Sequence, residues 1–413
     1  MVVQRNKSMS KANKVLTVFG DLEYENSRYV FEDNPWDLWQ NMPEYNPKNI
    51  ASKDAYLTLE VTFDDDSAVE SFAKLADLNI TDQTKSTWFP KPVRDKYVTG
   101  YLGEYQRKEQ YSEENYPKYP IYIVSKTRWE IRLTSDSLIE MGIKHYMIVE
   151  EHQYEMYKQH TDPNWVTLLI LPQKYLDEYD TCDDLGATKS KGPGAARNFA
   201  WDHSISIGAK RHWVMDDNQK RFFRSNADKR YYAMSGAIFR AMEDHSDRFE
   251  NVYISGPHYR FFVVPDENRP PFVQNCRIYS CLLILNDIPY RWRGRYNEDT
   301  DLSLRVLKDG HCTIQYNAFS TGKLVTQAVA GGNTAEFYSK EGTLPKSEMI
   351  ERLHPDVAKV TWMNNRWHHH VSYDKFKKNR LIPVNHTYHN PDSEYGMSLG
   401  KLDFVGDIDG NEE

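Results

Sequence analysis

Cysteine is scarce in this chain, whose 413 residues include four: Cys182, Cys276, Cys281 and Cys312. None of them belongs to a C-x-x-C pair or shows the spacing of a zinc site, so the sequence offers no thiolate metal centre. So few cysteines also argue against the disulfide framework of a small secreted domain. They favour a reducing compartment, and we expect a cytoplasmic protein.

Long apolar runs and a strong excess of one charge are also missing. No apolar stretch reaches the about 18 residues of a transmembrane helix, and the polar N-terminus lacks the apolar core of a signal peptide. The net charge of −8, from 52 basic and 60 acidic residues, argues mildly against a surface coated in nucleic acid but leaves room for local basic patches. The length allows about two or three domains.

The most informative stretch present is an apolar segment that ends in acids. Residues 213–215 (Trp-Val-Met) are typical of the end of a buried strand, and Asp216, Asp217 and Asn218 follow directly. Because α/β proteins bind ligands at the carboxyl ends of strands, adjacent carboxylates there are placed to hold Mg²⁺ or Mn²⁺ and, through the ion, a diphosphate. Taken alone, such a triplet more often forms a polar turn or a helix cap.

A glycine-rich segment precedes this strand. Gly192-Pro193-Gly194 leads into a helical pattern that continues to about Lys210, with Arg197 and Asn198 in its first turns. Glycines let the backbone come close to a ligand, and an Arg-Asn pair at a helix start can hydrogen-bond phosphate or a base. The ordered set of loop, helix, strand and acids is much less expected by chance than any one part.

A third acidic element lies about 80 residues downstream of the first. Glu298, Asp299 and Asp301 open a segment with helical spacing at Leu302, Val306 and Leu307. Acids at this position can complement the helix dipole, or one carboxylate can point into a site as a general base. Both can hold at once, and the other two elements favour a role in the site.

In order and rough spacing, these elements resemble the GT-A glycosyltransferases. The segments YPIYIVSKTRWE, GPGAARN, WVMDDN and RWRGRYNEDTDLSLRVLKDG look closer still to the TET-associated glycosyltransferases, which are encoded mainly by bacteriophages and are related to the glucosyltransferase that makes base J. The similarity covers roughly residues 118–335. It departs from the family pattern at Asn218, where an aspartate is usual; an amide oxygen still ligates a hard cation but adds no charge, so which of the three residues contacts the metal stays open.

The resemblance implies a role for each element on the donor side. Mn²⁺ or Mg²⁺ would be held by Asp216, Asp217 and Asn218. The nucleotide sugar, most often a UDP-sugar, would contact Lys126, Arg128, Arg197, Asn198 and Asp216, although the first two can equally be solvated cations in a loop. Asp299 or Glu298 would take the acceptor proton; whether the sugar carbon is inverted or retained stays open. In several such enzymes a late histidine completes the metal shell, and His354 or one of 368–370 would serve, although a histidine run is more often a surface feature.

The acceptor side has two candidate segments. Arg291, Trp292, Arg293 and Arg295 interleave cations with an aromatic ring and precede the acids directly, which suits DNA phosphates and a stacked base; a solvated surface hairpin is the alternative. His258-Tyr259-Arg260 is the second candidate, because a base modified inside a duplex must be flipped out between aromatic walls. Residues 321–323 and 331–334 are expected to form a loop near the acceptor, and they lack the strand–helix context of a P-loop.

The implied function is metal-dependent transfer of a sugar to the hydroxyl of a 5-hydroxymethylpyrimidine, 5-hydroxymethylcytosine above all, in phage DNA, which protects that DNA from host nucleases. Such a protein works in the host cell cytoplasm, without a membrane partner, and can associate with other DNA-modification enzymes. Two alternatives stay open: a GT-A enzyme with a non-DNA acceptor, and a non-catalytic nucleotide-sugar-binding scaffold of a modification complex. None of the catalytic acids is missing, which favours an enzyme.

The expected architecture is α/β: a GT-A-type, Rossmann-like, mainly parallel sheet flanked by helices, with a small N-terminal α/β module. We divide the chain into an N-terminal extension (1–54), an accessory module (55–92) that ends in Thr87-Trp88-Phe89-Pro90, a linker (93–118), the GT-A domain (119–335) and a polar C-terminal extension (336–413). The last holds Trp362, the run Trp367-His368-His369-His370 and a basic stretch at 375–380. The segment Pro35–Trp39 is expected to pack onto a neighbouring domain. In the GT-A domain we expect strands at 120–125, 144–150, 165–171, 211–216, 250–255, 260–264 and 278–285, and helices at 130–141, 151–159, 194–209, 226–246 and 299–309.

Overall fold

The computed structural model describes most of the chain. The described residues are 2–3, 34–47, 59–81, 84, 87, 98–110, 112–183, 192–227, 229–263, 268–323, 344–363 and 366–402. They belong to two compact units, the first drawn from residues 1–17, 50–98 and 401–413 and the second from residues 18–49 and 99–400. The finer domain boundaries expected from the sequence stay a prediction.

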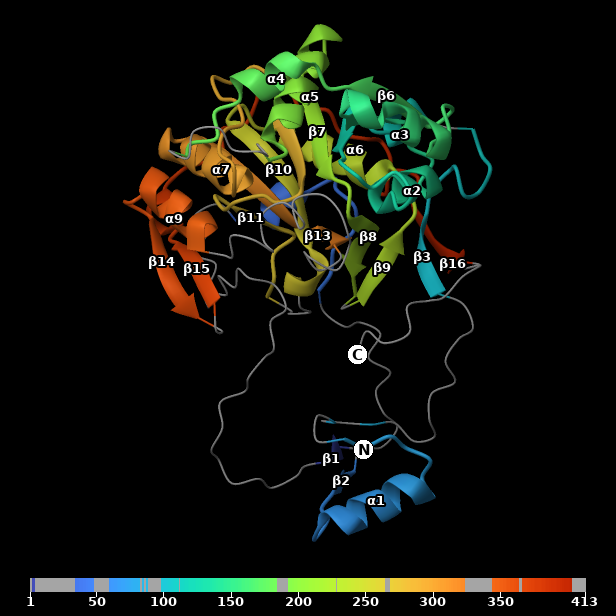
Figure 1. Ribbon diagram of the computed structural model, residues 1–413. Helices are drawn as coiled ribbons and strands as arrows, with labels where there is room; N and C mark the ends of the chain where they lie inside the picture. Colours follow the sequence, from blue (N-terminus) through green and yellow to red (C-terminus); the bar gives the residue numbers. More distant parts are fainter. Residues whose placement is uncertain are drawn as a thin grey trace. The chain divides into compact units, whose positions relative to one another are not determined.

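The smaller unit combines one helix with a pair of short strands (Figure 1). β1 (Val2–Val3) and β2 (Glu60–Val61) pair in parallel. α1 (Asp66–Leu75) begins where the Asp65 carboxylate accepts a backbone hydrogen bond from the first turn, which satisfies one of the unpaired N–H groups of the helix start. The strand–helix pattern expected for the accessory module is present; residues 88–90 of its Trp-Phe-Pro motif lie outside the described residues.

The larger unit is built on one twelve-stranded mixed sheet. Its strand order is β16-β3-β9-β8-β13-β10-β12-β7-β4-β5-β6, and β11 pairs with β13 outside this path. The strands span β3 Val98–Leu102, β4 Ile121–Val124, β5 His145–Val149, β6 Val166–Ile170, β7 Arg211–Asp216, β8 Gln219–Asn226, β9 Lys229–Ala233, β10 Val252–Tyr259, β11 Phe272–Gln274, β12 Cys281–Leu285, β13 Cys312–Lys323 and β16 Ser398–Leu402.

Four neighbouring strands form a continuous parallel block at one end of this sheet. β7, β4, β5 and β6 pair in parallel in that order, and Val124 of β4 lies opposite Asp216 of β7. β12 runs antiparallel to β7, and β8 and β9 form an antiparallel hairpin beside β13. The expected α/β class with a parallel, helix-flanked core is therefore confirmed. The strands beyond it pair in both senses: β10 runs parallel to β13, and β3 runs parallel to β9.

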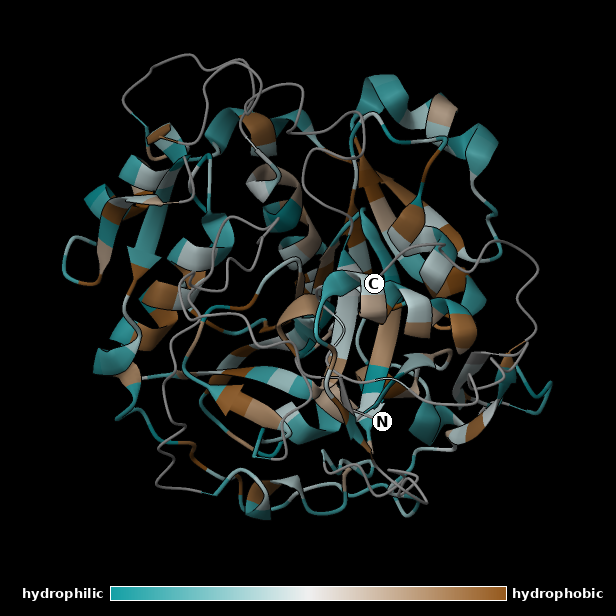
Figure 2. Cartoon of the chain, turned by 90° about the horizontal axis from the view of Figure 1, so that it is seen from below, coloured by the Kyte–Doolittle hydropathy of each residue, from teal (hydrophilic) through white to brown (hydrophobic). Residues whose placement is uncertain are grey.

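Alternate residues of the central strands face two separate apolar layers. Ile121 and Ile123 of β4, with Trp213 and Met215 of β7, pack in one cluster. Tyr122, Val124 and Val214 belong to the other. Because both faces are covered, these strands are continuous apolar runs rather than alternating ones. Figure 2 shows the apolar residues gathered along the central strands.

Helices cover both faces of the sheet (Figure 1). Leu138, Tyr157 and Phe239, from α2, α3 and α6, pack in the first cluster, and Trp201 and Leu302, from α5 and α7, pack in the second. The helices span α2 Leu133–Glu140, α3 Tyr154–His160, α4 Gln173–Glu178, α5 Gly194–Ser206, α6 Ala237–Ser246, α7 Glu298–Lys308 and α9 Leu344–Leu353. Short 3-10 helices, which supplement them, are η1 Asp37–Trp39, η2 Glu113–Asn115, η3 Glu151–Gln153, η4 Arg260–Phe262 and η6 Asp374–Phe376.

Two further segments dock on this body. Trp39 of η1 is buried, with its ring 5.2 Å from that of His245 and 6.2 Å from that of Phe272, which confirms that the Pro35–Trp39 segment packs onto the neighbouring core. The hairpin of β14 (Ala358–Met363) and β15 (Arg366–Val371) shares an apolar cluster with α7 and α9. That cluster consists of Leu304, Leu307, Ile350, Val357, Ala358, Val371 and Phe376.

Some expected elements differ from the structure. The helix expected at 226–246 is β9 followed by the shorter α6, which starts after Gly236. The strand expected at 260–264 is the 3-10 helix η4. The long strand β13 was not expected at all, although it lies at the centre of the sheet. Across the described residues, no helix is both long and apolar enough to cross a membrane.

Candidate active site

The acidic motif lies at the carboxyl edge of the parallel strands. Since Val124 is opposite Asp216, the residues that follow β4 and β7 meet at this edge. The start of α2 contacts the acidic motif: the Thr134 hydroxyl donates a hydrogen bond to the backbone carbonyl of Asp216 at 2.6 Å. The sequence therefore placed this motif correctly at the end of a buried strand.

Asp216 lies between two cations. Its Oδ1 is 2.7 Å from Nη2 of Arg197, and its Oδ2 is 2.8 Å from Nζ of Lys323. Burial by itself would raise the pKa of Asp216, but Lys323 and Arg197 together hold that pKa well below its ordinary value. Asp216 is therefore an ionised carboxylate held in place by two charge-assisted hydrogen bonds.

Asp217 has a different set of partners, which come from the loop after β4. Its Oδ2 accepts a hydrogen bond from the Ser125 hydroxyl at 2.7 Å, and its Oδ1 accepts one from Arg128. Burial raises the pKa of Asp217, against the opposing effect of Arg128. Arg128, a predicted donor-binding residue, thus lies at the acidic motif, whereas Lys126 pairs with Glu150 at 3.1 Å.

Asn218 is buried, and its Oδ1 has no hydrogen-bond partner. An unsatisfied buried oxygen beside two carboxylates is the kind of atom that a hard divalent cation takes as a ligand. By the chemistry of these donors, the residues fit Mn²⁺ or Mg²⁺, although the described residues contain no cluster of three His, Cys, Asp or Glu side chains. The metal assignment stays a prediction.

The two glycines at the start of α5 make room for neighbouring protein atoms. A Cβ on Gly194 would lie 1.8 Å from the Tyr179 hydroxyl, and Gly192 has a φ of +73° with the carbonyl of Arg295 in the way of a Cβ. Both positions therefore exclude larger residues. The loop is tightly packed at these two glycines. This packing fixes the position of the first turn of α5, which carries Arg197.

Arg197 connects all three elements that the sequence singled out. Besides its bond to Asp216, its Nη1 lies 3.0 Å from Oε1 of Glu298, and its guanidinium lies over the Trp292 ring at 4.7 Å. Asn198 exchanges two hydrogen bonds with the backbone of Trp292, at 2.9 and 3.0 Å. Asn198 thus positions the segment that carries Trp292, and its contact with the donor stays a prediction.

The two candidate bases at the start of α7 have different environments. Glu298 is buried, and burial raises its pKa to about 7 against the opposing effect of Arg197. Asp299 is half-buried, and one of its oxygens accepts the backbone N–H of Thr300 at 2.7 Å. The two neighbouring carboxylates therefore differ: Glu298 is paired with Arg197, and Asp299 is more accessible.

The four predicted acceptor residues do not form one surface. Trp292 and Arg295 are buried, the first under Arg197 and the second 3.6 Å from Asp183. Arg293 pairs with the fully buried Asp301, whereas Arg291 is exposed over the Trp201 ring. Acids with little solvent exposure need nearby cations. This accounts for Arg293 beside Asp301 and for Arg295 beside Asp183. The role of the four residues in acceptor binding stays a prediction.

The predicted histidines contact neighbouring side chains of the protein, and their part in a metal shell stays a prediction. His354 is 2.9 Å from Asp301, and His369 is 3.3 Å from Arg277. His368 accepts a hydrogen bond from Arg366 at 3.2 Å. His354, which follows α9, thus bonds to α7, and His369 connects β15 to Arg277, whereas the contact between His368 and Arg366 lies within β15.

Sequence reasoning missed Ser280 and Tyr279 and misplaced Lys323, whereas Tyr259 was among the predicted acceptor candidates. Nζ of Lys323 also donates to Ser280 at 2.8 Å, and the same hydroxyl is 2.5 Å from that of Tyr259, whose ring stacks on Tyr279 at 5.0 Å. Lys323 was expected in a loop, but it ends β13. The signal was present in the alternation of Cys312, Ile314, Tyr316 and Ala318 with polar residues at 313, 315 and 317.

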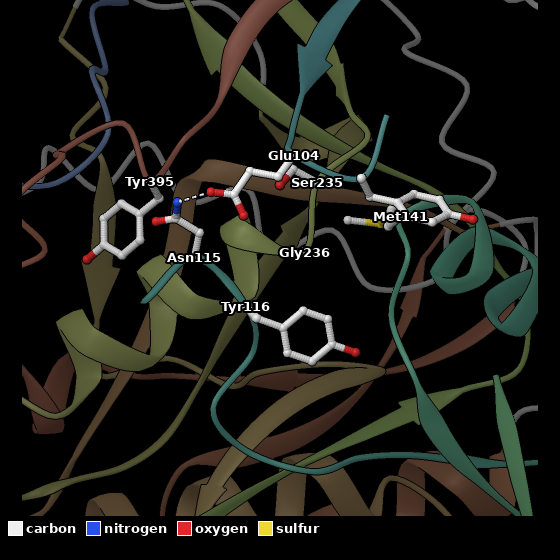
Figure 3. Close-up of a pocket in the computed structure, with 8 residues that line it drawn as sticks. Glu104, Asn115, Tyr116, Met141, Ser235, Gly236 and Tyr395 are labelled. Atoms are coloured by element: carbon white, nitrogen blue, oxygen red, sulfur yellow. Dashed lines mark hydrogen bonds between the residues drawn. The ribbon is translucent and has the colours of Figure 1, made fainter. Parts of the chain in front are cut away.

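A small pocket lies elsewhere on the larger unit (Figure 3). Glu104 accepts the side-chain amide of Asn115 at 2.8 Å and the backbone N–H of Ser112 at 2.7 Å. Tyr116, Gly236 and the buried Tyr395 complete its wall. These hydrogen bonds and the aromatic packing identify a structural joint between distant parts of the chain.

A family model described as TET-Associated Glycosyltransferase matches residues 119–332. No curated protein gives a significant match. Among solved structures, the "Crystal structure of GalNAc-T7 with UDP, GalNAc and Mn2+" is similar at 10% sequence identity and a TM-score of 0.35, over 81% of this chain and 66% of that chain. This chain thus spans slightly less than two thirds of that protein, and at this TM-score the likeness says nothing about the site.

Proposed function

The chain belongs to the TET-associated glycosyltransferase family, whose model covers more than half of it, and on this premise we propose that it moves a sugar from a nucleotide-sugar donor to the hydroxyl of a 5-hydroxymethylpyrimidine in DNA. The base favoured by the resemblance is 5-hydroxymethylcytosine, and the donor it favours is a UDP-sugar. The observation that carries the proposal is the bridge made by Arg197, which donates a hydrogen bond to Asp216 and forms an ion pair with Glu298. Donor-side and acceptor-side acids thus belong to one cluster.

On the donor side, three cations surround the acidic motif. Arg128, Arg197 and Lys323 each bond to Asp216 or Asp217, and each lies where a diphosphate beside these acids would meet positive charge. Asp216, Asp217 and Oδ1 of Asn218 would hold Mn²⁺ or Mg²⁺. When bound, such an ion supplies Lewis-acid neutralisation of the leaving diphosphate.

On the acceptor side, Asp299 is the better placed of the two candidate bases. Glu298 is engaged by Arg197, whereas Asp299 is more accessible and has one oxygen beyond its bond to the Thr300 N–H. In the proposed step, Asp299 takes the proton of the acceptor hydroxyl while that oxygen bonds to the anomeric carbon of the sugar. The bond from that carbon to the diphosphate breaks, and the diphosphate leaves with the electron pair.

The biological setting of the proposal follows from the resemblance. Sugar on the bases of phage DNA would block host nucleases, and the work would take place in the host cell cytoplasm. The four cysteines are free, as a reducing compartment requires. The net charge of −8 keeps a non-DNA acceptor as the second candidate.

A nucleoside digest followed by mass spectrometry tests the proposal. DNA with 5-hydroxymethylcytosine or 5-hydroxymethyluracil is incubated with the protein, Mn²⁺ and a panel of nucleotide sugars. We expect the mass of one sugar on one modified base. Hydrolysis of the donor that depends on Mn²⁺, without any transfer to DNA, would instead support a non-DNA acceptor. If neither transfer nor hydrolysis occurs, the result would support the non-catalytic binding scaffold.

A further inference from the structure

The tip of the β14–β15 hairpin carries two exposed tryptophans. Trp362 is 57% exposed and Trp367 is 39% exposed, whereas Trp39, Trp201 and Trp292 are buried. Trp362 and Trp367 lie directly opposite each other in the strand register, and their rings meet edge to face at 5.0 Å. Large exposed aromatics that are held together in this way mark an interaction surface.

The register shows which way this pair faces. Cross-strand partners share a face of the hairpin, and alternate pairs share the same face. Ala358 and Val371 are buried in the cluster with α7 and α9. The pair Val360 and His369 follows on that face, and Trp362 with Trp367 comes next. The tryptophans therefore continue the face of the hairpin that packs on α7 and α9.

That face leads to the candidate base. Nε2 of His369 is 3.3 Å from Nη1 of Arg277, and the same Nη1 donates to the Thr300 hydroxyl at 3.3 Å. Thr300 is the residue next to Asp299. Two residues of a strand span about 7 Å. The tryptophan pair therefore begins about that far along the strand from His369, whose link to the start of α7 runs through Arg277.

The same arginine connects to the donor end through stacked rings. The guanidinium of Arg277 lies over the Tyr279 ring at 4.2 Å, and Tyr279 stacks on Tyr259 at 5.0 Å. Tyr259 shares the Ser280 hydroxyl with Lys323, which bonds to Asp216. A line of aromatic and cationic side chains thus extends from the acidic motif to the hairpin.

The hairpin and the segment after it are basic. Residues 358–380 contain six lysines and arginines against one acid, in a chain whose net charge is −8. Two of these cations, Lys375 and Lys377, pair with Asp356 and Asp374, and Lys359 is exposed on the hairpin itself. Exposed indoles with nearby cations are the combination that binds unpaired nucleic acid strands.

We propose that Trp362 and Trp367 form a stacking platform for unpaired bases of the acceptor DNA beside the base that receives the sugar. The inference rests on the proposed function and adds to it how the DNA is held. An intact duplex has no unpaired bases to stack, so the acceptor is single-stranded or locally opened DNA. Indoles with lysines also suit a membrane surface, but the contacts that lead to Asp299 favour the acceptor.

Binding of a fluorescent single-stranded oligonucleotide with one 5-hydroxymethylcytosine tests this platform. We expect Trp362→Ala and Trp367→Ala each to raise the Kd for the oligonucleotide by about 5- to 100-fold, and Trp362→Phe to keep most of the affinity because it keeps a stacking ring. Trp36→Ala, at a tryptophan that is 37% exposed on another part of the unit, serves as the matched control and should not change the Kd. Calorimetry with the nucleotide sugar confirms that each variant is folded.

Measurements on the wild-type protein distinguish failure of the stacking platform from failure of the proposed function. If it glycosylates DNA while both alanine variants bind and react like the wild type, the platform is wrong and the proposed function stands. If it neither binds nor glycosylates DNA, the proposed function fails and the platform with it. If the alanine variants lose affinity for vesicles that contain anionic lipid but not for DNA, the tryptophans belong to a membrane surface and the inference is overturned.

Discussion

Nζ of Lys323 lies 2.8 Å from Oδ2 of Asp216, although 107 residues separate them in the chain. The contact exists because β13 ends beside the hairpin that starts with β8, directly after the acidic motif: Lys323 lies opposite Gln219 in the strand register. Asp216 raises the pKa of Lys323 even though burial opposes this. The lysine is therefore a permanent positive charge beside the acidic motif.

This contact predicts that Lys323→Met weakens donor binding. Loss of one charge-assisted hydrogen bond should raise the Kd of the nucleotide sugar by about 10- to 100-fold, and Lys323→Arg should restore part of the affinity because it keeps the charge. Isothermal titration with the donor and Mn²⁺ measures this. Lys229→Met, at an exposed lysine on β9, is the control. A Kd for Lys323→Met equal to that of the wild type would exclude a donor role for the lysine.

The metal assignment predicts a loss that depends on the ion. Asp217→Asn removes one carboxylate from the oxygen donors, so Mn²⁺ binding followed by electron paramagnetic resonance should weaken. Addition of EDTA should lower donor affinity in the wild type but have little further effect on the variant. The exposed Asp177 gives the matched control, Asp177→Asn. Normal Mn²⁺ affinity in Asp217→Asn would move the metal away from this motif.

The two acids of α7 predict separate kinetic effects. Asp299→Asn should lower the transfer rate by about 10²- to 10⁴-fold, as loss of a general base does, and should leave the donor Kd unchanged. Glu298→Gln should instead raise the donor Kd, because Glu298 helps to hold Arg197 through their 3.0 Å contact. An unchanged rate in Asp299→Asn would assign the base to Glu298 or to another residue.

The raised pKa of Glu298 predicts a pH effect of known sign. Burial raises this pKa from its ordinary 4.5 to about 7, so the carboxylate is charged above pH 7 and neutral below it. Its bond to Arg197 weakens as it takes up a proton, and donor affinity should fall as the pH drops through about 7. Affinity measured from pH 5.5 to 8.5 shows this inflection, and Glu298→Gln should remove it. An inflection that persists in the variant would belong to another group.

Local patterns were enough to predict the parallel part of the fold. β7 is found at the predicted residues, and β4, β5 and β6 differ from prediction by a residue or so at each end, because strands buried on both faces are unbroken apolar runs between polar loops. β8 and β9 were not predicted. Their charged and aromatic residues, Gln219–Asn226 and Lys229–Ala233, lack a clear alternation. Only their pairings define them as strands: β8 with β13 and β9, and β9 with β3 as well.

The candidate site was predicted in its parts but not in its contacts. Arg128, Arg197, Asp216, Asp217 and Glu298 are in one cluster, as the order of the motifs suggested. Lys323 joins this cluster through a strand pairing that no local pattern encodes. The arginines at 291–295 were grouped because they are neighbours in sequence, but a buried acid elsewhere, Asp301, determines where Arg293 points.

Asp301 gives a prediction about stability rather than catalysis. Its fully buried carboxylate bonds to Arg293, Arg305 and His354 at 3.1, 2.8 and 2.9 Å, and these bonds hold its pKa at about 2 although burial opposes them. Asp301→Asn leaves the arginines without their counter-charge, which should lower the free energy of unfolding by about 2–3 kcal/mol, less than for a fully buried pair because both arginines are partly solvated.

The sign of the pH dependence follows from the lowered pKa of Asp301. The stabilisation is present above the unfolded value of about 3.8 and is lost as the pH falls toward 2. Urea unfolding of the wild type and of Asp301→Asn at pH 7 and at pH 3 measures both effects, and the difference between them should shrink at the lower pH. Asp309→Asn, at the end of the same helix, is the control. An equal difference at both pH values would show that Asp301 stabilises α7 by packing rather than by charge.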